Sequence, residues 1–128
     1  MNILSDAFGV HETALRAKSQ RLELIAQNIA NADTPNFKAK DVDFKTVMAR
    51  VQGGSMKTTN ARHFTVGGDG TGTDDIQYRI PLNSSADGNT VELSIEQAAY
   101  GRAAAEYRAS LMFIENKITS IKRILRGE

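Results

Sequence analysis

The sequence predicts a mainly α-helical protein. An N-terminal and a C-terminal heptad helix pair as an antiparallel coiled coil, with an irregular, partly β segment between them. Two observations carry this prediction. Apolar residues recur at spacings of three and four near both ends of the chain. A cluster of helix-ending residues closes the first helical stretch, and glycines punctuate the middle. The 128 residues are expected to form one domain, divided into 1–32 (first helix), 33–90 (turn, extended segment and flexible middle) and 91–128 (last helix).

The first helix is expected over about residues 2–32. His11 and Lys18 fall in its apolar register and interrupt it with polar groups. The positions expected to pack, within the chain or in an assembly, are Leu4, Phe8, Leu15, Leu22, Ile25 and Ile29.

A turn ends this helix at a fixed place. Pro35 cannot continue a helix, and it pushes Thr34 towards extended geometry. Pro35 and Asn36 suit the two central positions of a β-turn, because Asn tolerates a left-handed backbone. The residues assigned to this turn are Asn28, Asn31, Thr34, Pro35, Asn36 and Phe37.

The segment after the turn is expected to be short and extended, since Phe37, Val42 and Phe44 alternate loosely with charged residues. Farther on, residues 63–66 and 76–82 have β-like patterns, and the glycine-rich stretch 67–72 is expected to be a flexible linker.

The last helix is expected over about residues 91–125. Thr90 or Ser94 is expected to cap its start, and Gly127 suits its end. We expect its apolar row to pack mainly within the chain. That row consists of Tyr100, Ala104, Tyr107, Leu111, Ile114, Ile118, Ile121 and Leu125.

The composition argues against several classes of function. The net charge is +1, and basic and acidic residues are interspersed, which does not suit nucleic-acid binding. The chain has no cysteine, and its two histidines, His11 and His63, lack the partners of a metal or catalytic motif. The glycine-rich stretch lacks the Lys-Ser/Thr of a phosphate loop, and the spacing of Asp69, Asp74 and Asp75 does not fit a calcium loop. We therefore expect no enzyme, cofactor, metal or small-molecule substrate.

A hairpin of two such helices is only marginally stable in water, because the apolar surface that it buries barely offsets the entropy of ordering the chain. The sequence therefore indicates folding that is completed by other chains. Charged residues on the outer helix faces are candidates for ion pairs between subunits: Glu12, Arg16, Arg21, Glu23, Arg102 and Arg108.

The stretch R-L-E-L-I-A-Q-N-I-A-N-A-D-T-P-N-F-K-A-K-D-V-D-F (residues 21–44) resembles the signature of bacterial flagellar basal body rod and hook proteins. Asn36 stands where that family usually has glycine. The tail K-A-K-D-V-D-F and the segment D-G-N-T-V-E-L (Asp87–Leu93) resemble the proximal rod members in particular. The resemblance covers about two-thirds of the chain.

This resemblance implies a non-catalytic structural subunit of the basal body rod. It would assemble with copies of itself and other rod proteins in the periplasmic space, near the membrane ring and its adaptor. It also implies passage through the flagellar type III export gate, and we expect export without a cleaved signal peptide because residues 1–10 contain no basic run. Phe44 and Met48 fit the short apolar motif by which such substrates dock at the gate, or they simply pack. A cytoplasmic coiled-coil adaptor or export chaperone is the alternative, and an enzyme is a distant third.

Overall fold

The computed structural model describes residues 3–52 and 76–127. Its helices are α1 (Ile3–Ala30), α2 (Phe44–Gln52) and α3 (Leu93–Arg126), and its strands are β1 (Lys40–Val42) and β2 (Ile76–Tyr78). The predicted strand at 63–66, His63, the glycine-rich linker and the three aspartates considered for calcium lie outside the described residues.

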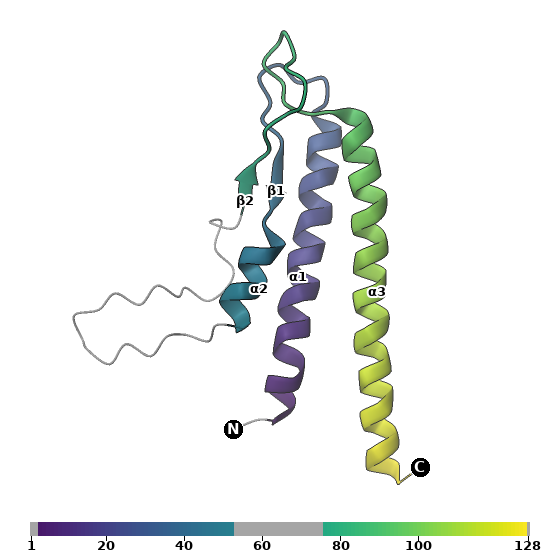
Figure 1. Cartoon of the computed structure of the whole chain (residues 1–128). Coiled ribbons are helices and arrows are strands. Elements are labelled where there is room, and N and C mark those ends of the chain that lie inside the picture. The colour runs from purple at the N-terminus through teal and green to yellow at the C-terminus, as the bar shows by residue number, and fades with distance from the viewer. Residues whose placement is uncertain (1–2, 53–75, 128) are drawn as a thin grey trace, which may run out of the picture.

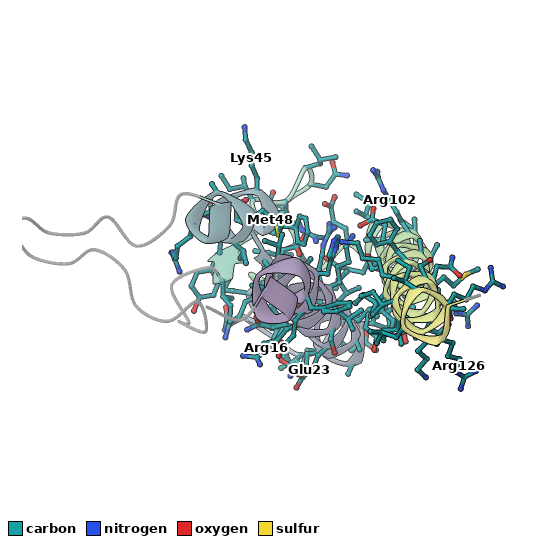
Figure 2. The ribbon with its side chains drawn as sticks, turned by 90° about the horizontal axis from the view of Figure 1, so that it is seen from below. Arg16, Glu23, Lys45, Met48, Arg102 and Arg126 are labelled. Atoms are coloured by element: carbon teal, nitrogen blue, oxygen red, sulfur yellow. The ribbon has the colours of Figure 1, made fainter. Side chains whose placement is uncertain are left out.

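Helices α1 and α3 run antiparallel along most of their length, as Figure 1 shows, which confirms the predicted fold class. Figure 2, which looks along the helices, shows α1 between α2 on one side and α3 on the other. The central helix therefore packs on two faces, whereas α3 has α1 as its one extensive neighbour within the described chain.

The strands β1 and β2 form a two-stranded antiparallel sheet beside α1. Lys40 pairs with Tyr78, and Val42 pairs with Ile76. The buried apolar cluster of the chain lies between this sheet, α2 and α1. Its members are Ala17, Leu24, Val42 and Val47, with Phe44 and Ile76 packed against them.

Helix α2 was not predicted, and the extended segment expected to reach Phe44 ends at Val42. Asp43 explains the change. Its carboxylate accepts hydrogen bonds from the backbone N–H of Thr46 (3.2 Å) and from the Thr46 hydroxyl (2.7 Å). These bonds hold the pKa of Asp43 below its usual range. An aspartate in this position is a helix N-cap, so one of the charged residues of the expected extended segment begins a helix instead.

The predicted caps of α3 are correct at the end of the helix and wrong at its start. Gly127 adopts the left-handed conformation at φ 74°. At the start, Glu92 occupies the N-cap position without a side-chain capping bond. Thr90 is unavailable because its hydroxyl accepts the N–H of Ala39 (2.8 Å), and Ser94 lies inside the helix. Tertiary contacts outweigh the local capping signal.

Candidate functional site

The predicted turn at the end of α1 is present. The N–H of Phe37 donates to the carbonyl oxygen of Thr34 (3.3 Å), which places Pro35 and Asn36 at the two central positions. Asn36 has a φ of 60°, the one positive value among the described non-glycine residues. Asparagine therefore supplies here the left-handed backbone that a turn of this type requires.

The loop before α3 closes over this turn. The N–H of Asn36 donates to the carbonyl oxygen of Asp87 (3.0 Å), and the N–H of Thr90 donates to that of Phe37 (3.0 Å). Gly88 has a φ of 75°, and a Cβ there would lie 2.6 Å from the Asn36 side-chain oxygen, so a larger residue does not fit. We call residues 31–39 together with 85–92 the junction.

Asn89 ties the junction to the end of α1. Its side-chain amide donates to the carbonyl oxygens of Asn31 (3.0 Å), Ala32 (2.9 Å) and Thr34 (2.8 Å), while its Oδ1 accepts the N–H of Val91 (2.7 Å). The last carbonyls of a helix lack partners within the helix. A buried side chain 55 or more residues away in the sequence therefore provides the C-terminal cap of α1.

The Asn28 side chain satisfies backbone groups of β1, as Asn89 does for the end of α1. Its side chain donates to the carbonyl oxygen of Lys40 (2.8 Å) and accepts the N–H of the same residue (3.1 Å). This two-way pairing imitates a neighbouring strand, and Asn28 is almost completely buried while it does so. The assigned turn residue Asn28 therefore positions the sheet on α1.

Four charged side chains form a network next to this pairing. Asp41 accepts from the Nε of Arg21 (3.0 Å) and from Arg79 (2.8 Å). Arg79 also pairs with Glu96, which is fully buried and accepts from the amide of Asn28 (3.3 Å). Two cations and two anions balance, so the network can be partly buried without an unpaired charge.

This network joins α1, β1, the end of β2 and α3. It also corrects one expectation. Arg21, considered for an ion pair between subunits, is partly buried and bonded within the chain. Among the other candidates, Arg16 pairs with Glu12 and Arg102 with Glu106, each within its own helix and with the arginine largely exposed.

Farther from the junction, the helix pair is held by fewer polar contacts. Lys18 donates to Glu106 (3.3 Å), and its ammonium lies 4.8 Å from the centre of the Phe44 ring. His11 packs on Phe113, with 4.9 Å between ring centroids. The Nε2 of His11 also lies 3.1 Å from the Nζ of Lys117, so His11 is a packing residue of the helix pair.

The assigned packing positions of α1 lie in the helix as expected. Ile25 is fully buried, and Phe8, Leu15, Leu22 and Ile29 are half-buried. Leu4 lies in the first turn. Sequence reasoning missed Ala17 and Leu24, which are buried on the second face of α1, where the sheet and α2 pack.

The assigned row of α3 divides into two. Ala104, Tyr107, Ile114 and Ile121 are half-buried. The other four are exposed, so the expectation that the whole row packs within the chain is wrong. Helix α3 is rotated relative to the expected register. Ala103 is buried and Ser110 and Lys117 are half-buried, so these residues complete the packed side of α3 in place of the exposed four. We call the four the outward row: Tyr100, Leu111, Ile118 and Leu125.

Comparison with known proteins identifies the kind of molecule that carries this junction. A family model described as flagella basal body rod protein matches residues 8–38, which include most of α1 and the turn. A flagellar basal body rod protein FlgB of Aeromonas hydrophila is 41% identical over 126 residues, covering 95% of this chain and 94% of the relative. The FlgB of Cereibacter sphaeroides is 40% identical over 124 residues, and that of Escherichia coli is 34% identical over 132 residues. Each of these two alignments covers 96% of the relative.

The chain belongs to the flagellar basal body rod protein family. It is therefore a structural, non-enzymatic component of the flagellar basal body rod, and its partners include other rod proteins. The turn and the loop before α3, which both carried the resemblance, are the two halves of the junction, and the bonded residues Ala39 and Thr90 are 51 positions apart in the sequence.

Within residues 3–52 and 76–127, no three His, Cys, Asp or Glu side chains are grouped so that they could hold a metal ion. No described helix is long and apolar enough to cross a membrane. Large apolar side chains stay exposed on α3, among them Met112, Phe113, Ile124 and Leu125.

Four residues of the junction and network were missed in the sequence: Asp41, Arg79, Asn89 and Glu96. Asn89 stood inside a recognised turn signal, Asp-Gly-Asn, without its capping role being visible. The buried charges give no sequence signal, because each becomes buried only through its partner.

Proposed function

We propose that this rod subunit belongs to the proximal rod, where it assembles with copies of itself and with other rod proteins near the membrane ring and its adaptor. We further propose that it reaches the periplasmic space through the flagellar export gate. The relatives named FlgB, aligned over nearly the whole chain, support this assignment.

One observation carries the assembly part of the proposal. The four side chains of the outward row are exposed along α3, from 36% at Leu111 to 81% at Leu125. Contiguous exposed apolar surface on a soluble chain marks an interaction site. We propose that the outward row forms contacts between subunits, while the half-buried positions of α1 and α3 hold the chain together.

The assembly role can be tested in cells that lack the native gene. Replacing Leu111 and Ile118 by serine is expected to abolish incorporation into isolated basal bodies and swimming, because the apolar contact is lost. Asn116→Ser and Thr119→Ser, at exposed positions of the same helix, are the matched controls and should incorporate normally. Full incorporation of the double variant of the outward row would contradict the proposal.

The export part concerns Phe44 and Met48. In the folded chain, Phe44 packs against the apolar cluster and under Lys18, so packing accounts for its position. An export motif would act before folding, when Phe44 is free to bind the gate. Phe44→Ala with Met48→Ala is expected to reduce secretion into the medium in a strain that secretes rod subunits. Lys45→Ala, whose side chain points away from the bundle in Figure 2, should not. Equal secretion of all variants would contradict an export role.

A further inference from the structure

A histidine and a lysine bond to each other near the far end of the helix pair, where α1 begins and α3 ends. Of the hydrogen bonds that the described side chains form between the two helices, the one between His11 and Lys117 lies nearest this end. The Nε2 of His11 and the Nζ of Lys117 are 3.1 Å apart. Figure 1 shows α1 and α3 wider apart here than at the junction, so this bond joins the helices where they diverge.

The chemistry of the two groups decides which of them donates. A lysine ammonium has three N–H donors and no acceptor. The Nε2 of His11 must therefore accept the hydrogen bond, which places the imidazole proton on Nδ1. This bond can form only while His11 is neutral.

Phe113 packs against both partners. Its ring centroid lies 4.9 Å from that of His11, and the Nζ of Lys117 lies 5.6 Å from the centre of the same ring. The face of an aromatic ring attracts a cation, so Phe113 favours an ammonium at this place. We call His11, Phe113 and Lys117 the histidine contact.

A proton on the Nε2 of His11 would reverse the histidine contact. Two donors would then face each other, and two positive charges would lie 3.1 Å apart. Both side chains are half-buried, so water screens the repulsion between these charges less than it would at an exposed site. Histidine is the side chain that ordinarily changes its charge between about pH 5 and about pH 8. The pair of helices therefore loses an attraction and gains a repulsion when His11 is protonated.

The other charged groups near His11 are already engaged or carry the same sign. A hollow of about 310 Å³ between the helices is lined by His11 and by two charged residues, Lys18 and Glu106. Lys18 is a further cation, and Glu106 already accepts a hydrogen bond from it (3.3 Å). Glu12, next to His11 in the sequence, is exposed and pairs with Arg16. A protonated His11 therefore has no unengaged carboxylate among these neighbours.

We propose that the histidine contact is a proton-sensitive switch in which neutral His11 holds the far ends of α1 and α3 together and protonated His11 lets them separate. The separated helices bind the proton more readily, so this contribution to stability is lost as the pH falls through the range in which histidine is protonated. Separation uncovers Ile114 and Ile121 beside the outward row. The switch acts within the single chain and so goes beyond the assembly role proposed above.

The absence of native cysteine allows two fluorescent labels to be attached at chosen positions of the purified full chain. Arg16→Cys and Asn116→Cys place the labels at exposed positions of α1 and α3. Energy transfer between the labels then measures the separation of the two helices. We expect the transfer to fall between about pH 7.5 and about pH 5.5, and to recover when the pH is raised again.

Two variants remove the switch and keep the helices. His11→Gln retains a side-chain oxygen that can accept from Lys117, but it does not titrate. Lys117→Met keeps an apolar side chain near Phe113 and removes the charge. Energy transfer in both variants should stay constant over the same pH range. Labels near the junction, at the exposed positions Ala26→Cys and Ala98→Cys, should also report no change in the native background.

Constant energy transfer between the far-end labels in the native background would overturn the proposal. An equal fall in His11→Gln would also overturn it, because a group other than His11, such as His63, would then be responsible. An equal fall in Lys117→Met would show that repulsion from Lys117 is not the cause.

If the labels prevent folding, the unlabelled native chain and the two variants can be compared by urea denaturation at the same two pH values. The midpoint should fall with the pH in the native chain and stay nearly constant in His11→Gln and Lys117→Met. Equal falls in all three proteins would contradict the proposal.

Discussion

The two ends of the helix pair are held together in different ways. Where α1 ends and α3 begins, directional hydrogen bonds and ion pairs bind every neighbouring element: Asn28, Asn89 and Glu96 are buried and fully engaged. Where α1 begins and α3 ends, Ile124 and Leu125 are largely exposed. The buried residues of α3 are Glu96 and Ala103, both in its first three turns. The chain therefore specifies its own turn end, whereas the far end is the part that we propose other subunits cover.

The largest expected effect comes from breaking the network at the turn end. Glu96→Ala removes the buried carboxylate and leaves Arg79 with Asp41 as its remaining partner. We expect the free energy of unfolding to fall by about 3 kcal/mol, as is usual when one member of a buried ion pair is removed. Urea denaturation followed by circular dichroism measures this. Glu115→Ala, exposed on the same helix, should change it by less than about 0.5 kcal/mol. Equal losses of unfolding free energy for the two variants would show that the turn end contributes no more to stability than an exposed position of α3.

The next effect comes from the cap on α1. Asn89→Ala leaves the carbonyl groups of Asn31, Ala32 and Thr34 without the amide that they share. We expect a loss of about 2 kcal/mol, the cost of leaving buried polar groups unsatisfied. Asn83→Ala, at an exposed position in the same loop, is the control. A native stability for Asn89→Ala would mean that water replaces the amide at no cost.

A smaller loss of stability is expected from substitutions at the far end of α3. Ile121→Ser, on the half-buried side of α3, is expected to destabilise the monomer by about 1 kcal/mol. Ile118→Ser, in the outward row, should change it by less than about 0.5 kcal/mol while it impairs assembly. The same denaturation experiment distinguishes them. A larger loss for Ile118→Ser would place the outward row in the fold of the single chain.

The smallest effect is a pH dependence midway along the pair. Burial raises the pKa of Glu106, but hydrogen bonds from Arg102 and Lys18 together outweigh it and hold the pKa below its usual 4.5. A carboxylate with a lowered folded-state pKa stabilises the fold above 4.5, and this contribution is lost as the pH falls through the folded-state value.

Glu106→Gln removes that contribution at neutral pH. Its stability should therefore fall less than that of the native chain between about pH 5 and about pH 3. Glu12→Gln, at a largely exposed position, is the control and should follow the native curve. Parallel curves for all three proteins would show that Glu106 gains nothing from its partners.

Sequence periodicity and turn chemistry predicted the fold class and the turn, because both depend on neighbouring residues. Pro35 and Asn36 fix their backbone angles locally, and the apolar spacing fixes which segments are helical. Periodicity did not predict the rotation of α3, since a row of apolar residues is compatible with more than one partner. Leu111 and Ile114 satisfy the same pattern, and the structure buries the second more than the first.

The remaining misses come from contacts between residues far apart in the sequence. Arg79 and Glu96 look like surface residues until the fold brings them together across α1. Thr90 looks like a helix cap until Ala39 takes its hydroxyl. Helix α2 is an exception, because Asp43 caps it through a bond to nearby Thr46, and this role could have been recognised from the residue type and position alone.

Amide hydrogen exchange on the purified monomer tests most directly whether the turn end of the helix pair is more stable than its far end, because it reports local opening residue by residue. We expect strong protection in residues 24–30 and 96–104 and rapid exchange in residues 112–126 of α3. Addition of assembled rod subunits should then slow exchange in 112–126. Uniform strong protection along both helices of the isolated chain would contradict the account, because the far end would then be stable without other subunits.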